Sequence, residues 1–371
     1  MNYRVLGGVR KLKEIKPNFL KSSYLKNRLA DFIFKRWLIK FKKSFNPTKT
    51  DRVLVISMKA LGDNVVKATT FKIMAEKYGK ENLYIMCRDK WSSVFQELGY
   101  NVLEMKKLKN PLKNAKYKIE FFKKVNNLGF KEVILFEFEG TEEVLEGIVC
   151  DNKIGIYNKK ENSYMQRVVE IDYDKTYILD RQIYLLKELF NEDFTRDEIR
   201  PDMRELFHSK KYNDIISIGI GASSERKTMP IKNMGDVLKM ILKKYPNEKI
   251  VLLGSGKKQE EYARKLIDYC KSDKIESFVG KVPLVETIRL INDSIFFLGY
   301  DSGLSNVAFA LRKKYICLFW TDMTTWKHRF NDLRIIKGDG KNPINDGYHG
   351  TDILNSIKIE QIKTALIELK V

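Results

Sequence analysis

The chain has 371 residues, of which 43% are hydrophobic, and it carries a formal net charge of +21. This length suits two domains, and this apolar content excludes global disorder. No apolar run reaches the roughly 18 residues that a membrane-spanning helix needs, and the first residues lack the pattern of a secretory signal.

The basic charge is concentrated at the N-terminus. Residues 1–50 hold 14 Lys and Arg against Glu14 and Asp31, which gives this segment a charge of +12. A positive charge concentrated in one segment argues against a general nucleic-acid-binding surface, so we expect no nucleic acid partner.

The first predicted element is an amphipathic helix over residues 25–45. Its apolar side chains recur every fourth position: Leu29, Ile33, Trp37 and Phe41, together with Phe34 and Leu38. Lysines and arginines surround them, so the helix either lies on anionic lipid or packs on its own domain with its lysines in solvent. We expect residues 1–46 to bind the chain peripherally to an anionic membrane surface, at the inner face of the cytoplasmic membrane.

A strand–helix alternation begins at residue 52. The run 52–58 is almost continuously apolar, which is typical of a strand buried on both faces. The predicted strands of this series are 52–58, 82–87, 101–105, 132–138, 153–157 and 168–173, and its helices are 63–78, 113–126 and 175–190.

The charged, poorly periodic stretch 191–213 is predicted to be a linker, and the alternation restarts after it. The predicted strands are now 214–219, 249–253, 277–279, 294–298 and 315–319, and the helices are 232–244, 257–271, 284–292 and 303–311. A last amphipathic helix is predicted at about 359–370, and it could pack against either half.

Two such series predict two Rossmann-like, doubly wound parallel sheets that face a cleft. The predicted organisation has five parts: a basic N-terminal extension (1–50), a first Rossmann-like domain (51–195), a linker (196–213), a second Rossmann-like domain (214–345) and a C-terminal helix (346–371).

The four cysteines, Cys87, Cys150, Cys270 and Cys317, lie far apart in the sequence. Their spacing fits neither a zinc site nor a redox pair. We interpret Cys87 and Cys317, which lie in apolar runs, as small buried hydrophobic residues, which fits the reducing cytoplasm.

Ligands of open α/β sheets bind outside the carboxyl ends of the strands, so the loops there are the candidate site. Residues 57–64 follow the first strand, and Gly62 permits a tight turn. Asp63 then starts the next helix, where it is either the N-cap or a carboxylate that faces the cleft.

Two loops of the second series suit phosphate groups. Residues 219–230 hold two glycines, two serines, Arg226 and Lys227 between a strand and a helix, although they match neither the P-loop nor the G-x-G-x-x-G pattern. The alternative is an ordinary connecting loop. Residues 300–306 open a helix whose free N–H groups suit a diphosphate, and Asp301 suits sugar hydroxyls.

Two other patterns carry less weight. Asp172-Tyr-Asp174 has the D-x-D spelling of some metal sites, but it ends an alternating strand, and D-x-D is common by chance. His208, His328 and His349 are scattered without the order of a catalytic triad. We therefore expect no metal and no cofactor.

Taken together, the motifs resemble those of the family 9 glycosyltransferases, which include the lipopolysaccharide heptosyltransferases. The resemblance runs from about residue 52 to 330. Its motifs are Ala60-Leu-Gly-Asp63, Lys227-x-x-Pro230, Phe278-Val-Gly-Lys-Val282, Asp301-Ser-Gly-Leu-Ser305 and Phe319-Trp-Thr-Asp322.

The resemblance implies a GT-B fold and an inverting, metal-independent glycosyltransferase. It implies an ADP-heptose-like nucleoside-diphosphate sugar as donor and a lipopolysaccharide-core-like glycolipid as acceptor. By position, Asp63 corresponds to the general base. The implied donor-binding residues are Ser223, Ser224, Lys227, Glu260 (with Gln259 near the same position), Val282, Asp301, Ser302, Gly303, Leu304 and Ser305.

The chain departs from the family pattern at three places. Asn306 stands where heptosyltransferases commonly carry histidine, Asn64 replaces a typical valine, and the strand before Lys227 lacks the usual His-Pro-Gly. These departures bear on the donor sugar more than on the fold. The alternative function is a non-catalytic nucleotide-binding protein of the same fold at the membrane.

Overall fold

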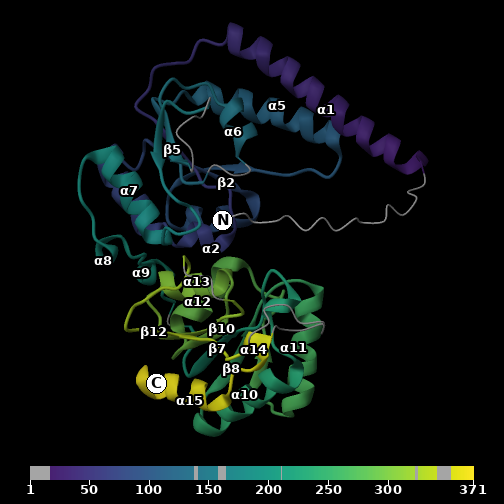
Figure 1. Cartoon of the computed structure of the whole chain (residues 1–371), viewed down its shortest axis with the longest axis vertical. Helices are drawn as coiled ribbons and strands as arrows, with labels where there is room; N and C mark the ends of the chain where they lie inside the picture. Colours follow the sequence, from purple (N-terminus) through teal and green to yellow (C-terminus); the bar gives the residue numbers. More distant parts are fainter. Residues whose placement is uncertain (1–16, 138–140, 158–163, 210, 322–324, 341–351) are drawn as a thin grey trace, which may run out of the picture.

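The computed structural model describes residues 17–137, 141–157, 164–209, 211–321, 325–340 and 352–371. Two parallel six-stranded sheets form two halves that lie one above the other (Figure 1). Among the described residues, no helix combines the length and the apolar character needed to cross a bilayer.

The first sheet has the strand order β3-β2-β1-β4-β5-β6. Its strands are β1 (Val53–Ile56), β2 (Leu83–Arg88), β3 (Asn101–Met105), β4 (Glu132–Leu135), β5 (Lys153–Tyr157) and β6 (Arg167–Glu170). The β1 and β4 side chains are buried throughout, as expected for central strands covered on both faces.

The second sheet has the order β12-β11-β10-β7-β8-β9, which repeats the order of the first when its strands are counted from β7. Its strands are β7 (Ile215–Gly219), β8 (Lys249–Leu253), β9 (Ile275–Ser277), β10 (Phe297–Tyr300), β11 (Tyr315–Leu318) and β12 (Leu333–Ile336). Both sheets therefore have the doubly wound Rossmann topology that the sequence predicts.

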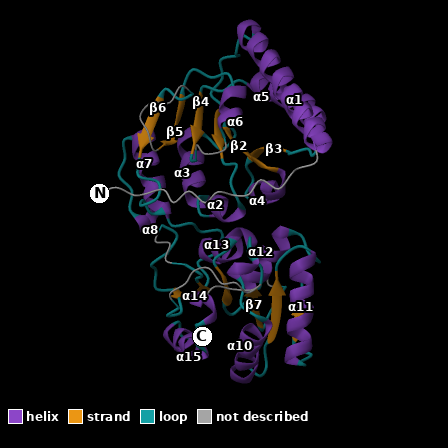
Figure 2. Cartoon of the chain, turned by 45° about the vertical axis from the view of Figure 1, so that its right-hand side comes forward, coloured by secondary structure: helices purple, strands orange, loops and turns teal. Residues whose placement is uncertain are grey.

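Helices cover both sheets (Figure 2). Those of the first half are α1 (Pro17–Ser44), α2 (Leu61–Val65), α3 (Ala68–Tyr78), α4 (Ser92–Glu97), α5 (Pro111–Leu128), α6 (Glu142–Gly147) and α7 (Ile178–Phe190). The rest are α8 (Arg196–Ile199), α9 (Arg204–Phe207), α10 (Ile231–Lys244), α11 (Lys257–Cys270), α12 (Leu284–Asp293), α13 (Gly303–Ala310), α14 (Asp352–Asn355) and α15 (Ile359–Glu368).

The predicted helix over 63–78 is divided in two. Its chain direction changes at Val66 and Lys67, between α2 and α3, and the Lys67 side chain is fully buried there. The predicted linker contains α8 and α9, which are too short for a periodic pattern to reveal. The sequence also gave no sign of α4, α6, α14 or the edge strand β12.

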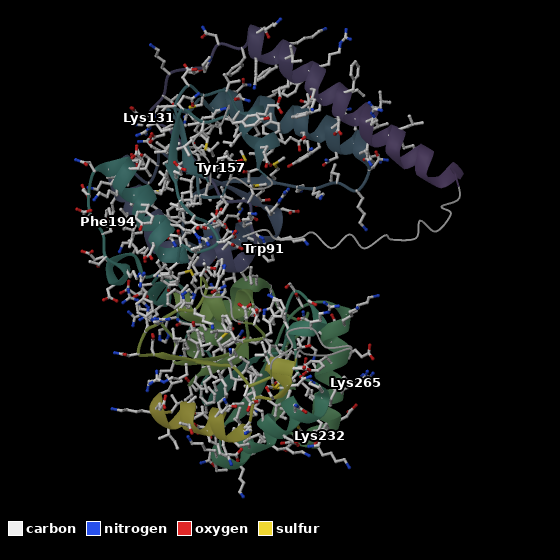
Figure 3. The ribbon with its side chains drawn as sticks, viewed as in Figure 1. Trp91, Lys131, Tyr157, Phe194, Lys232 and Lys265 are labelled. Atoms are coloured by element: carbon white, nitrogen blue, oxygen red, sulfur yellow. The ribbon has the colours of Figure 1, made fainter. Side chains whose placement is uncertain are left out.

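The two halves contact each other through helices near the carboxyl ends of their strands. Helix α2 packs on α13, and α4 packs on α12. Trp91, just before α4, lies at the side of the first half that faces the second (Figure 3). One hydrophobic cluster runs through the contact, with Leu61 on one side and Phe309 on the other, so the halves share a continuous apolar core.

Helix α1 packs along α5 and has two different apolar faces (Figure 1). Ala30, Phe34 and Leu38 point inward and are buried in the core of the first half. A second set remains exposed on the outer side: Leu25, Leu29, Phe32, Ile33 and Ile39. The helix therefore belongs to the domain and also presents an apolar stripe to solvent.

All four cysteines have free, buried thiols, as the sequence predicts for Cys87 and Cys317. Burial raises the pKa of the Cys87 thiol to about 12, so this group stays protonated and unreactive.

Candidate active site between the two halves

The loop after β1 carries Asp63 into the space between the halves. Asp63 is the third residue of α2 and is partly exposed. The N-cap position is taken by Ala60, which makes no side-chain cap. The N-cap interpretation of Asp63 is therefore wrong.

Asn64 holds the Asp63 turn in place. Its side chain is buried, and its Nδ2 donates hydrogen bonds to the carbonyl oxygens of Lys59 (3.1 Å) and Ala60 (2.9 Å). Valine could not make these bonds. The departure at this position thus stiffens the loop that presents Asp63.

A buried ion pair lies behind Asp63. Lys67 pairs with Glu137, and its Nζ also donates to Ser57 Oγ at 3.0 Å. The Lys67 ammonium lies 4.9 Å from the centre of the Phe136 ring. Burial raises the pKa of Glu137, the Lys67 charge lowers it, and the nearby Asp63 carboxylate raises it further.

The second half presents a cation on the opposite side. Lys227 Nζ lies 3.3 Å from Asp301 Oδ2 and 4.8 Å from the centre of the Trp320 ring. Trp320 Nε1 donates to the same carboxylate oxygen at 3.0 Å. Asp301 and Trp320 therefore hold the Lys227 ammonium at the carboxyl end of the second sheet, where it can meet a phosphate.

Two buried tyrosines fix the Lys227 loop. The Tyr300 hydroxyl accepts a hydrogen bond from the Met229 amide (3.0 Å), and the Tyr262 hydroxyl donates to the Met229 carbonyl (2.6 Å). The sequence analysis missed Tyr262, Tyr300 and Trp320 as site residues. Tyr300 begins the loop 300–306 and Trp320 lies within the motif Phe319-Trp-Thr-Asp322, whereas nothing in the pattern around Tyr262, on α11, connects it to the Lys227 loop.

The start of α13 supplies N–H groups. The first amides of a helix lack partners within the helix, and Ser302 is the N-cap of α13. Ser302 Oγ is buried and has no hydrogen-bond partner among the described residues, so it is a free group at this helix start. Ser305 Oγ donates to the Tyr300 carbonyl instead, which leaves only the Ser305 amide for a ligand.

A second group of predicted residues gathers along α11. Gln259 Oε1 accepts from the Ser255 amide at 2.8 Å, and Gln259 Nε2 donates to the Ala222 carbonyl at 3.4 Å, so this side chain joins two loops. Glu260 approaches Gly280: a Cβ at Gly280 would lie 2.5 Å from Glu260 Oε1. Ser223 and Ser224 are exposed in the neighbouring loop, and Val282 is half-buried.

The two loops meet at Gly62. A Cβ at Gly62 would lie 2.4 Å from Asn306 Nδ2, so a larger residue here would require the Asn306 side chain to shift. Leu61 packs against Gly303 at ordinary contact distance, since an added Cβ at Gly303 would lie 3.4 Å from the Leu61 Cβ. Asp63 on α2 and the loop 300–306 at the start of α13 thereby lie on adjacent helices of opposite halves.

The D-x-D pattern does not join the site. Asp172 follows β6 and pairs with Lys175 on the surface at 2.7 Å. Among the described residues, no group of three or more His, Cys, Asp or Glu side chains is arranged to hold a metal ion. His349 and the last residue of the fifth motif, Asp322, lie outside the described residues.

Comparisons with known proteins agree with this architecture. Residues 151–342 match the model of glycosyltransferase family 9 (heptosyltransferase). Lipopolysaccharide heptosyltransferase 1 of Campylobacter coli is 24% identical over 291 residues, which cover 72% of this chain and 83% of the relative.

Solved structures show the same fold. The E. coli heptosyltransferase WaaC with ADP superposes with a TM-score of 0.69 at 13% identity, over 86% of this chain and 99% of that one. A family 9 glycosyltransferase from Veillonella parvula gives a TM-score of 0.69 at 16% identity, over 87% and 99% of the two chains. The two halves thus form a GT-B fold.

Proposed function

Because the chain belongs to glycosyltransferase family 9, the heptosyltransferase family, we propose that it transfers a heptose from an ADP-heptose-like donor to a glycolipid. The acceptor we propose is a hydroxyl of a lipopolysaccharide core. The observation that supports this proposal is the contact of α2 with α13, in which the helix of Asp63 meets the helix that follows the loop 300–306 from the opposite half.

Asp63 is the proposed general base. As the acceptor oxygen attacks the anomeric carbon, the Asp63 carboxylate takes the hydroxyl proton, and the bond from that carbon to the diphosphate oxygen breaks. The diphosphate leaves with the bonding electrons, and attack from the opposite face inverts the configuration. Asp63 lies outside the segment matched by the family model, so its assignment depends on its exposed position and lack of a capping role.

The donor half would stabilise the leaving diphosphate. Its negative charge grows as the bond breaks, and Lys227 with the first amides of α13 would oppose that charge. Ser302 Oγ would donate to the same group. Asp301 has one carboxylate oxygen committed to Lys227 and Trp320 and would offer the other to a sugar hydroxyl. Glu260 and Val282 would take the ribose and base, and Ser223 and Ser224 the phosphates.

The membrane partner is part of this proposal. The outer stripe of α1, defined by Leu25, Leu29, Phe32, Ile33 and Ile39, is exposed and is interspersed with basic residues such as Arg36. Such a stripe suits the surface of an anionic bilayer, which for a cytoplasmic enzyme is the inner face of the cytoplasmic membrane. A glycolipid acceptor is confined to the same surface, so docking raises its effective concentration.

The test is an assay of ADP release from ADP-heptose with and without a deacylated core oligosaccharide, in buffer with and without EDTA. We expect acceptor-dependent release that survives EDTA, with the configuration of the product inverted in its NMR spectrum. Asp63→Asn should melt normally and bind the donor, yet turn over about 10²–10⁴-fold more slowly.

Asp51→Asn, at an exposed position before β1, is the matched control and should behave as the native protein. Near-normal turnover by the Asp63→Asn variant would remove Asp63 as base. Donor binding without release, for every acceptor offered, would favour the non-catalytic alternative.

A further inference from the structure

A chain of polar side chains connects the two halves behind Asn306. The Tyr177 hydroxyl, at the start of α7, lies 2.7 Å from His328 Nδ1. His328 Nε2 lies 3.2 Å from Asn306 Oδ1. Tyr177 follows the first sheet, whereas His328 and Asn306 belong to the second half, so the chain spans the contact between them.

The direction of these hydrogen bonds follows from their end group. Asn306 Oδ1 accepts only, so His328 Nε2 must carry the proton. A neutral ring with its proton on Nε2 has a free lone pair on Nδ1, which accepts from the Tyr177 hydroxyl. Burial, and to a smaller degree the charge of Arg200, lower the pKa of His328 to about 3, which keeps the ring neutral.

The His328 ring has no freedom to turn. It stacks on Phe309, with centroids 3.6 Å apart and planes 6° from parallel, and it is 4% exposed. Phe309 belongs to α13, the helix that carries Asn306. The ring is therefore fixed to the same helix whose amide side chain it contacts.

The Asn306 amide is oriented with its oxygen toward His328 Nε2. With Oδ1 held by Nε2–H, the NH₂ group points the other way, toward Gly62. Gly62 precedes Asp63, and Asn306 is one turn after Ser302. We propose that Tyr177 and His328 are positioning residues that hold the Asn306 NH₂ group as a hydrogen-bond donor to an oxygen of the transferred sugar. This inference rests on the proposed function.

At position 306, where the family commonly has histidine, this chain therefore presents an amide N–H as a hydrogen-bond donor. A histidine ring presents its nitrogen according to its tautomer, whereas this amide presents N–H alone once its oxygen is engaged. The contact is to the sugar and not to the nucleotide, so it should distinguish ADP-heptose from ADP.

The experiment is a double-mutant cycle with His328→Phe and Asn306→Ala, measured as kcat/KM for ADP-heptose and as affinity for ADP-heptose and for ADP. Phe preserves the stacking and removes both nitrogens. We expect each single variant to lose roughly three- to tenfold in kcat/KM and in ADP-heptose affinity, with ADP affinity unchanged. The double variant should be no worse than Asn306→Ala alone.

His328→Gln, whose Nε2 can replace that of histidine, should recover most of the loss, and Tyr177→Phe should show a smaller loss. Additive effects in the cycle, or equal losses for ADP and ADP-heptose, would overturn the inference and leave His328 a packing residue.

A ligand-free measurement separates this inference from the proposed function. In the native protein, ¹⁵N NMR should show His328 neutral and protonated on Nε2 at pH 5–8, with the Nδ1 signal shifted in Tyr177→Phe. The opposite tautomer, or a protonated ring at pH 5, would sink the positioning chain even if transfer occurs. If instead the tautomer and the double-mutant cycle in ADP-heptose affinity are as expected but no acceptor receives a sugar, the proposed function is contradicted and the positioning role stands.

Discussion

At the scale of single residues, neighbouring side chains fix the position of the Lys227 ammonium and of its loop. Asp301 and Trp320 hold its ammonium, and Tyr262 and Tyr300 hold its loop. A lysine contact to a phosphate is worth about 1.5–3 kcal/mol. Its removal would also leave the Asp301 carboxylate without its cation partner, next to the proposed diphosphate site.

We therefore expect Lys227→Ala to weaken donor binding or slow turnover by roughly ten- to a hundredfold, measured by calorimetry and by ADP release. Lys227→Arg should retain part of the activity because it keeps the charge. Lys232→Ala, on the outer side of α10 (Figure 3), is the control. If neither affinity nor rate changes in Lys227→Ala, this lysine does not contact the donor.

The buried pair of Lys67 and Glu137 makes a different prediction, about stability. Removing one partner of a buried ion pair costs about 3–5 kcal/mol because the other charge is left uncompensated. We expect that loss for Lys67→Met in urea unfolding, and most of it should return in Lys67→Met/Glu137→Met. Lys72→Met, at an exposed position of α3, serves as control.

The pH dependence of this loss has a defined sign. Burial raises the pKa of Glu137, and Lys67 opposes the rise. Without Lys67, the folded state holds a proton that the unfolded state releases above about pH 4.3, so folding becomes less favourable as pH rises. The deficit of Lys67→Met should thus be larger at pH 8 than at pH 5. An equal deficit at both values would show that Glu137 keeps its charge some other way.

At the scale of elements, α1 combines two roles on opposite faces. Its inner residues Ala30, Phe34 and Leu38 complete the core around Phe122, so deletion of the helix would expose that core. Substitution of the outer face is the cleaner experiment. We expect Leu29→Gln/Phe32→Gln/Ile39→Gln to fold normally and to lose binding to anionic liposomes in sedimentation.

The matched control replaces an exposed apolar residue outside the outer stripe of α1 by glutamine. Leu206→Gln, at an exposed position of α9, removes an apolar side chain elsewhere and should leave liposome binding intact. Undiminished binding by the triple variant would show that the outer stripe is not the docking surface.

Most of the strands and long helices could be predicted, because buried parallel strands and amphipathic helices have strong periodic patterns. The pattern over 25–45 predicted a helix, but four-residue spacing alone could not tell the inner face at Phe34 and Leu38 from the outer one. The division of the helix at Lys67 escaped prediction, and the partner of the buried Lys67, Glu137, lies 70 positions away in the sequence. Tyr262 and His328 were missed for the same reason: their partners lie on other elements.

At the scale of the whole molecule, the approach of the halves depends on the missing side chain at Gly62. A methyl group there would lie 2.4 Å from Asn306 Nδ2, so either the Asn306 side chain or the two helices, α2 and α13, would have to shift. We expect Gly62→Ala to increase the radius of gyration in small-angle scattering and to lower kcat/KM. Gly62→Ala/Asn306→Ala should restore the compact form, although not the activity. An unchanged radius in the single variant would show that Asn306 can move aside.

The connection between the halves has a consequence for how the protein is made. In the described residues, the chain leaves the first sheet after β6 and enters the second at β7, and α15 then packs back on the second half against α10. All six strands of the first sheet are therefore synthesised before any strand of the second.

A ribosome that adds about 5–20 residues per second needs roughly 10–30 s to go from the end of β6 to the end of β12. During that interval the first half has a complete sheet but no partner for α2 and α4. The apolar side chains that later join the shared cluster, such as Leu61, then face water. The order of translation thus makes the future active-site surface the part of the nascent chain most exposed to wrong partners, and the arrival of α12 and α13 ends that exposure.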